Sequence, residues 1–340
     1  MAKVKKTYNI LLRILILLAT YGFLYKKIFH GKDWQQQYNL FMTLLDRPGI
    51  KMMLAFVILL MFLNWGIEAW KWRFMIRKIE KISFFRSLQA IFAGASISFF
   101  TPNRTGEYFG RAFILDKASH VEGILITILG SMSQLLVTIL MGSASLLVFV
   151  PYFLGDATFF SGYAYFGFAV LIVILNALLL FLFLNVQFLS VLREKLLRSR
   201  LKRFRKFFAV FSGFRNRDML YVICLCFLRY IVFTVQFLLL LKMFSVPVPL
   251  PEAVMIISLI FLVLSVVPTV TLTELGVRDT AAVYFFGIYF HHAGTMTDSI
   301  MIGILSAASV LWVVNLAIPA IIGTVFVSRL KFFRKNSPAE

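Results

Sequence analysis

Long apolar stretches alternate with short polar connections along the chain. Six stretches are long enough to cross a hydrocarbon core as a helix, which takes about 20 residues: residues 8–29, 50–71, 121–150, 162–187, 219–242 and 299–327. None shows the alternating pattern of a transmembrane β-strand. The pattern therefore predicts an all-α polytopic membrane protein with about six full transmembrane helices.

Two further apolar stretches, residues 84–100 and 252–267, are short for a full crossing. Each follows a full crossing, ends at a proline and a polar cluster, and is followed by another apolar segment. We interpret them as the first arms of two re-entrant helical hairpins, at residues 84–117 and 252–290.

The two polar clusters share one pattern. Each contains a serine, a proline, a glutamate and an arginine four residues after that glutamate: Ser98, Pro102, Glu107 and Arg111, and then Ser265, Pro268, Glu274 and Arg278. The spacing of four puts glutamate and arginine on one helix face, where they can pair. The crossings that precede the clusters run in opposite directions. This arrangement is typical of an inverted repeat whose broken helices meet near the bilayer midplane.

The organisation that follows is a single integral-membrane domain over residues 1–340. We place repeat one at about 50–187 and repeat two at about 219–327, joined by a basic cytoplasmic loop at 188–218. Asn176, Gln236 and Asn315 lie inside apolar stretches, so we expect them to form hydrogen bonds between helices.

Charge sets the expected orientation and partners. The net charge is +20, and basic residues gather in the two tails, the 71–86 connection and the 193–217 loop. The positive-inside rule then puts both termini in the cytoplasm. We expect the basic loop to lie on anionic lipid of the inner leaflet rather than on nucleic acid. With 60% hydrophobic residues, the chain is expected in the cell (cytoplasmic or inner) membrane.

The charges at the two clusters are the main candidates for a substrate site. A charge at the centre of a membrane helix costs about 2.5–3.5 kcal/mol on translocon scales, so several together need a protein-lined cavity. We assign these residues to substrate binding: Asn103, Arg104, Glu107, Arg111, Arg229, Thr273, Glu274 and Arg278. The alternative interpretation is that both motifs are ordinary interfacial loops with their charges among the headgroups.

Two charges outside the clusters have open roles. Arg229 lies near the middle of the 219–242 crossing and is either functional or part of a structural ion pair with Glu274 or Glu107. Glu68 lies near the expected cytoplasmic end of the 50–71 crossing, and we interpret it as an interfacial structural residue.

The motif Pro-Asn-Arg-Thr-Gly-Glu-(x3)-Arg at 102–111, with Pro-(x5)-Glu-Leu-Gly-Val-Arg at 268–278, resembles the flippase-like membrane domain of the lysylphosphatidylglycerol synthase family. The resemblance covers roughly residues 10–330. It implies paired re-entrant helices and movement of lipids with charged headgroups between leaflets. The second motif departs from the family by carrying threonine where more glycine is usual, at Thr269, Thr271 and Thr273.

In the aminoacyl-lipid synthases of this family, the membrane domain precedes a large soluble transferase. Here the chain ends at Glu340, soon after the last expected crossing, so we expect the transferase to be absent and assign no lysyl transfer. The resemblance and the charges together favour a lipid translocase, either a flippase or a scramblase, acting on an anionic or zwitterionic headgroup. Its polar cleft would lie between the two repeats.

Two alternatives stay open, an intramembrane lipid-modifying enzyme and a proton-coupled transporter of a small solute or ion. Transport is favoured over catalysis because no familiar nucleotide-binding, hydrolase or metalloprotease motif is present, and we assign no catalytic residue. No cofactor is expected. The adjacent His291 and His292 lack the companion ligands of a metal site, so we assign no metal. The sequence sets no oligomeric state.

Overall fold

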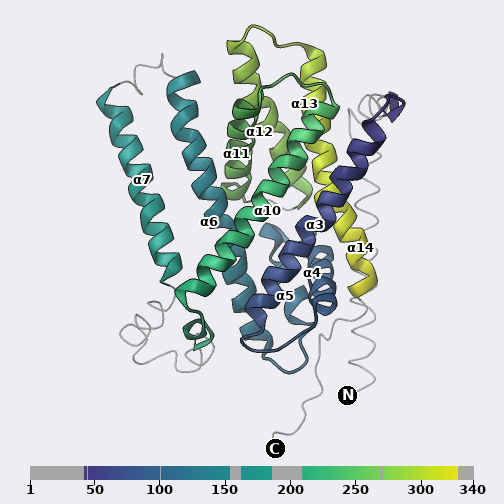
Figure 1. Cartoon of the computed structure of the whole chain (residues 1–340), viewed down its shortest axis with the longest axis vertical. Coiled ribbons are helices and arrows are strands. Elements are labelled where there is room, and N and C mark those ends of the chain that lie inside the picture. The colour runs from purple at the N-terminus through teal and green to yellow at the C-terminus, as the bar shows by residue number, and fades with distance from the viewer. Residues whose placement is uncertain are drawn as a thin grey trace, which may run out of the picture.

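The structure is a computed structural model that describes residues 42–43, 45–99, 101–153, 162–185, 209–268 and 271–327. Within these ranges every regular element is helical (Figure 1). The elements are α3 (Ile50–Ile76), α4 (Phe84–Ser98), η1 (Pro102–Arg104), α5 (Gly106–Ala112), α6 (His120–Phe153), α7 (Tyr163–Leu184), η3 (Ala209–Gly213), α10 (Asn216–Met243), α11 (Leu250–Val266), α12 (Thr271–His292), α13 (Asp298–Trp312), η4 (Val313–Ala317) and α14 (Ile318–Val327).

Five helical segments are long and apolar enough to cross a membrane: Ile50–Ile76, His120–Phe153, Tyr163–Leu184, Asn216–Met243 and Asp298–Val327. They coincide with five of the six predicted crossings, which confirms a polytopic helical membrane protein. The sixth, at residues 8–29, lies outside the described residues, as does most of the basic loop at 188–218. A count of six crossings therefore stays a prediction.

The two short apolar stretches form α4 and α11, of 15 and 17 residues. Each is followed by a second helix that packs against it, α5 on α4 and α12 on α11. Figure 1 shows the α4–α5 pair in one half of the molecule and the α11–α12 pair in the opposite half. This placement has the form of two hairpins that start from opposite sides. The inverted repeat and the re-entrant entry of both hairpins stay predictions.

Polar side chains join the long helices to one another. The Asn176 amide on α7 donates to the Ser143 hydroxyl on α6 over 2.7 Å, and Gln236 on α10 donates to the Val57 carbonyl on α3 over 2.9 Å. The side-chain oxygen of Asn315 in η4 accepts a hydrogen bond from the side-chain NH₂ group of Asn64 on α3 at 3.4 Å. The expectation that these three residues form interhelical hydrogen bonds is confirmed.

Direct packing between segments far apart in the sequence fixes the position of α4. The Ser96 hydroxyl donates to the Ala320 carbonyl on α14 over 2.5 Å. Gly323, one turn further along α14, faces the Phe92 carbonyl so closely that a Cβ atom there would overlap it. Small residues that let two backbones approach are typical of helix contacts in membranes. The first hairpin is therefore seated on the last helix of the described chain.

A carboxylate holds together the two loops at one end of the first hairpin. Glu80, in the connection between α3 and α4, accepts from the backbone N–H groups of Asp116, Lys117 and Ala118 at 3.0, 2.7 and 2.8 Å. Although burial raises the pKa of Glu80, these three bonds stabilise its charged form and bring the pKa below its usual range.

The sign of this shift predicts an acid-labile contact. Because the folded protein lowers the pKa of Glu80, its contribution is present above the unfolded pKa and is lost as pH falls through the folded value. We expect Glu80→Gln to lose roughly 1–3 kcal/mol of stability at neutral pH. The unfolding midpoint, measured from pH 3 to 7, falls as the pH drops below about 5, and this fall should be shallower in Glu80→Gln than in wild type. Glu122→Gln, at the first turn of α6 and outside this contact, is the control for the loss of one carboxylate.

Candidate functional site

The first polar cluster forms an irregular turn between α4 and α5. Asn103 and Arg104 both adopt left-handed backbone conformations, with φ of 49° and 56°. Such conformations are uncommon for residues other than glycine and concentrate at functional sites. The Thr101 hydroxyl accepts from the Gly106 N–H over 2.7 Å and closes the turn. A Cβ atom on Gly106 would lie 2.7 Å from the Ile97 carbonyl oxygen. The close contact between the start of α5 and the end of α4 therefore requires glycine at this position.

Glu68 on α3 is the centre of the buried ion network beside this turn. One carboxylate oxygen accepts from Arg111 at 2.7 Å. The other accepts from Lys71 at 2.7 Å and from Arg229 at 2.8 Å. Arg111 also pairs with Glu107 one helical turn away. The side chain of Glu68 is only 3% exposed, so three cations from α3, α5 and α10 converge on one carboxylate away from bulk solvent.

Arg229 is fixed in one orientation by several groups. Its Nε donates to the Asn64 side-chain oxygen over 2.8 Å, while its guanidinium carbon lies 5.5 Å from the ring centroids of Trp65 and Phe233. The sequence pattern offers Glu107 or Glu274 as an ion-pair partner for Arg229. That choice was wrong: the partner is Glu68, because α10 packs along α3.

A cavity of about 230 Å³ opens beside the network. Its lining comes from α3, η1, α5, α6, α10 and α11 and includes Glu68, Lys71, Asn103, Arg104, Glu107, Arg111, Gln134, Arg229 and Ser265. Four of these side chains are basic and two are acidic, a formal excess of two positive charges. Ser265 belongs to the second polar cluster, so residues of both clusters meet at this cavity.

The second Glu–Arg pair lies apart from the cavity lining. Glu274 and Arg278 form the pair that their spacing predicts, at 2.8 Å, and both side chains are largely buried in α12. Thr273 is exposed and borders an apolar pocket with Tyr284 and Phe285. The start of α12 packs near η1, so the two motifs are neighbours. The structure thus gathers Asn103, Arg104, Glu107, Arg111 and Arg229 at one cavity and leaves Thr273, Glu274 and Arg278 beside it.

Two residues of this site carried a weaker signal in the sequence. The sequence predicts an interfacial structural role for Glu68; α5 and α10 bury it at the centre of the ion network, and its depth in the membrane stays a prediction. Lys71, the first residue of the basic 71–86 connection expected from the sequence, lies inside α3 and is 1% exposed. The signal was the pairing of acid and base three positions apart within one transmembrane helix.

No group of His, Cys, Asp or Glu in the part of the chain that the structure describes is arranged to hold a metal ion. The charged groups that line the cavity are guanidinium, ammonium and carboxylate groups. Arginine and lysine together suit the binding of an anion with several oxygens, since guanidinium donates two parallel N–H bonds to a phosphate or carboxylate.

The fold and the site define a polytopic helical membrane protein with a buried, net-positive polar cavity. The family model described as the lysylphosphatidylglycerol synthase TM region matches residues 10–318, and the chain belongs to this family. The match confirms the resemblance found in the sequence and relates the chain to lipid handling in membranes. No curated protein and no solved structure matches the chain.

Proposed function

We propose that the chain is a lipid translocase, a flippase or scramblase that moves a lipid with a charged headgroup between leaflets. The observation that carries this proposal is the net-positive cavity framed by helices of both predicted repeats. A charged headgroup would occupy the cavity while its acyl chains stay in the bilayer. The family adds support, because its members are related to lipid handling.

The distribution of ion pairs indicates which cation meets the headgroup. Arg111 and Arg229 are bound to Glu68, and Arg111 also to Glu107. Arg104 lines the same cavity, and its buried Nε has no hydrogen-bond partner within the described ranges. The strained turn at Asn103 and Arg104 holds this guanidinium at the cavity. Arg104 is therefore the first candidate for a phosphate contact.

The other charges would set the position of this contact and its coupling. Glu107 is 12% exposed at its side chain and touches both the cavity and Arg111, so it is the carboxylate placed to exchange a proton with the cavity. The first hairpin is seated on α14, and movement of one repeat against the other would change which side of the cavity is open. Arg278 and Glu274 would act from the second hairpin as a supporting pair.

Leaflet exchange in proteoliposomes tests the proposal. Fluorescent lipids with anionic and zwitterionic headgroups would be followed by dithionite accessibility, with and without a proton gradient. We expect wild-type protein to exchange at least one of these lipids. Arg104→Gln should slow that exchange about tenfold or more, because a hydrogen bond to a charged group contributes about 1.5–3 kcal/mol.

The matched control is Arg47→Gln, the same change at an exposed arginine outside the cavity, which should exchange at the wild-type rate. Wild-type exchange no faster than in empty vesicles would contradict the proposal, as would equal loss in both variants.

A transporter of a small anion is the second candidate, favoured by the size of the cavity. Its volume of about 230 Å³ is below the roughly 300–1,000 Å³ of typical ligand pockets. The same proteoliposomes, loaded with an anion-sensitive dye, distinguish the two functions. Anion flux without lipid exchange, lost in Arg104→Gln, would assign the cavity to a small anion.

A further inference from the structure

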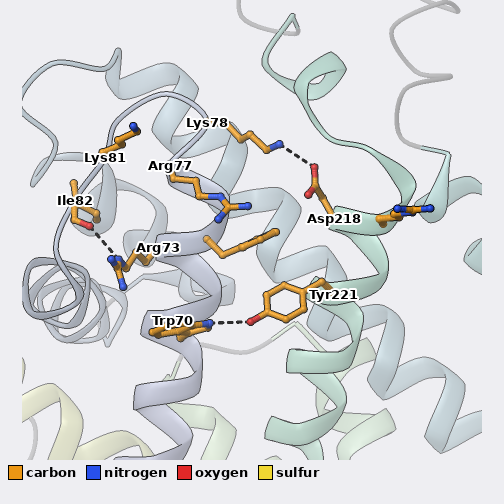
Figure 2. A pocket seen from close by; sticks show the side chains of 10 residues that line it. Trp70, Arg73, Arg77, Lys78, Lys81, Ile82, Asp218 and Tyr221 are labelled. Atoms are coloured by element: carbon orange, nitrogen blue, oxygen red, sulfur yellow. Dashed lines mark hydrogen bonds and ion pairs between the residues drawn. The ribbon is translucent and has the colours of Figure 1, made fainter.

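A second charged hollow lies outside the cavity, between the C-terminal end of α3 and the N-terminal end of α10 (Figure 2). Its volume is about 900 Å³, and five basic side chains line it: Arg73, Arg77, Lys78, Lys81 and Arg217. We call it the basic groove. One acidic residue lines it as well, so the groove carries a formal excess of four positive charges.

The walls of the basic groove are fixed to each other. Lys78 on the α3 side and Asp218 on α10 form an ion pair at 2.9 Å. Below it, the Trp70 indole donates to the Tyr221 hydroxyl over 2.9 Å. Figure 2 shows the Trp70–Tyr221 link running from α3 to α10 and the Lys78–Asp218 link running from the turn after α3 to α10, with the Arg77 side chain pointing into the space between them. These two interactions connect the two sides of the groove and hold them at a fixed distance from each other.

Two guanidinium groups in the groove are positioned while most of their donors stay available. Arg73 Nε donates to the Ile82 carbonyl over 3.1 Å, and the guanidinium carbon lies 5.5 Å from the Trp70 ring centroid. Arg77 lies 4.1 Å from the ring centroid of Phe74. Each guanidinium has five N–H donors. A guanidinium held over an aromatic ring by a cation–π contact keeps its N–H donors, which lie in its own plane, free to reach the oxygens of a ligand.

Only one of the five basic side chains, Lys78, has an ion pair among the residues that the structure describes. Arg73, Arg77, Lys81 and Arg217 form none within these residues. The stretch 193–206, which precedes α10 in the sequence, is itself strongly basic, so charge does not favour it as an occupant of the groove. The complementary ligand is an anion with several oxygens.

The rim of the groove identifies the source of that anion. Trp70 and Tyr221 are 46% and 40% exposed, and Leu220 beside them is 55% exposed. Tryptophan and tyrosine concentrate at the headgroup level of membrane proteins, and basic residues beside a transmembrane helix attract anionic lipid. Exposed apolar groups next to the charges also provide a surface for acyl chains.

We propose that the basic groove is a binding site for the phosphate headgroup of an anionic phospholipid in the leaflet at this end of α3. The site is separate from the cavity at Glu68, since the two share no lining residue. It does not depend on the proposed translocation, because a lipid can occupy the groove at equilibrium without crossing the membrane.

Fluorescence quenching of Trp70 tests the site. The full-length protein would be reconstituted in phosphatidylcholine vesicles with increasing fractions of phosphatidylglycerol brominated on its acyl chains. The Trp70 signal is the difference between wild-type protein and Trp70→Phe. Brominated phosphatidylcholine gives the reference, and the two half-quenching fractions give a relative binding constant for the anionic lipid.

We expect phosphatidylglycerol to bind several-fold more strongly than phosphatidylcholine in wild type. In Arg77→Gln/Lys81→Gln the preference should fall to about one, because each basic residue near the surface contributes a factor of up to roughly five. Lys117→Gln is the matched control: it removes an exposed lysine at the same end of the molecule but outside the groove, and it should keep the wild-type preference.

Equal quenching by both lipids in wild type would overturn the proposal, as would an equal loss of preference in Lys117→Gln and the double variant. Calorimetry with inorganic pyrophosphate in pure phosphatidylcholine vesicles covers the remaining outcome. Saturable pyrophosphate binding without any lipid preference would assign the groove to a soluble anion and overturn the lipid site. Leaflet exchange is not measured here, so failure of this proposal is distinguishable from failure of the translocase.

Discussion

Glu68→Gln is expected to destabilise the protein by about 3–5 kcal/mol, the usual cost of removing one member of a buried ion pair. The carboxylate is the shared partner of Lys71, Arg111 and Arg229. Glutamine keeps the shape but removes the charge, so three buried cations would lose their shared partner, and among the described residues only Arg111 would keep an ion pair, with Glu107. The free energy of unfolding in mixed detergent micelles measures the loss.

A double variant separates the electrostatic contribution to the lost stability from the contribution of packing. In Glu68→Gln/Arg229→Gln one of the uncompensated cations is also removed, so part of the lost stability should return. Residues that share a network are expected to be non-additive in this way. Lys51→Gln, at the exposed start of α3, is the control for loss of a single charge on the same helix. A double variant that is less stable by the full sum of the two single changes would contradict the network.

Gly323→Ala is expected to have the second large effect, through backbone contact rather than charge. The new methyl group would overlap the Phe92 carbonyl and the Ser96 hydroxyl on α4. Neither α4 nor α14 can relieve this contact by rotating a side chain away from a main-chain oxygen. Overfilling a packed contact costs about 1–3 kcal/mol, so we expect a lower unfolding midpoint and slower leaflet exchange as the first hairpin shifts.

Gly66→Ala provides the matched control within the membrane helices. Outside the adjacent backbone of α3, no atom of the described residues lies within 4 Å of a Cβ built at Gly66, and alanine is favoured over glycine in a helix by about 1 kcal/mol. This variant should be as stable as wild type or more stable. Similar behaviour of the two glycine variants would show that the close approach of α4 and α14 does not limit stability.

Features that depend on local periodicity could be predicted from the sequence. The apolar lengths gave five crossings that the described helices reproduce. Spacing alone also predicted the Glu107–Arg111 and Glu274–Arg278 pairs, because residues four apart always share one face of a helix. Pro102, together with the polar residues after it, predicted that α4 would end in an irregular turn.

The membership of the site could not be predicted in the same way. The two motifs look equivalent in the sequence, yet the first supplies the charges of the cavity while the second contributes Ser265 and keeps its Glu–Arg pair beside it. Glu68 precedes Arg229 by 161 positions, and no local spacing could indicate their contact. Similarly, the basic residues of 71–86 predicted orientation, but their convergence with the start of α10 follows from how α3 and α10 cross.

The sequence by itself determined the class of protein, the helical segments and the family, because hydrophobic length, helix periodicity and short motifs are local properties of a chain in a membrane. Only the tertiary structure decided that Glu68 gathers three cations and that the cavity is net positive. It also decided that α4 is seated on α14 at Gly323. These features arise from side chains on different helices, and packing sets the partners of a buried charge.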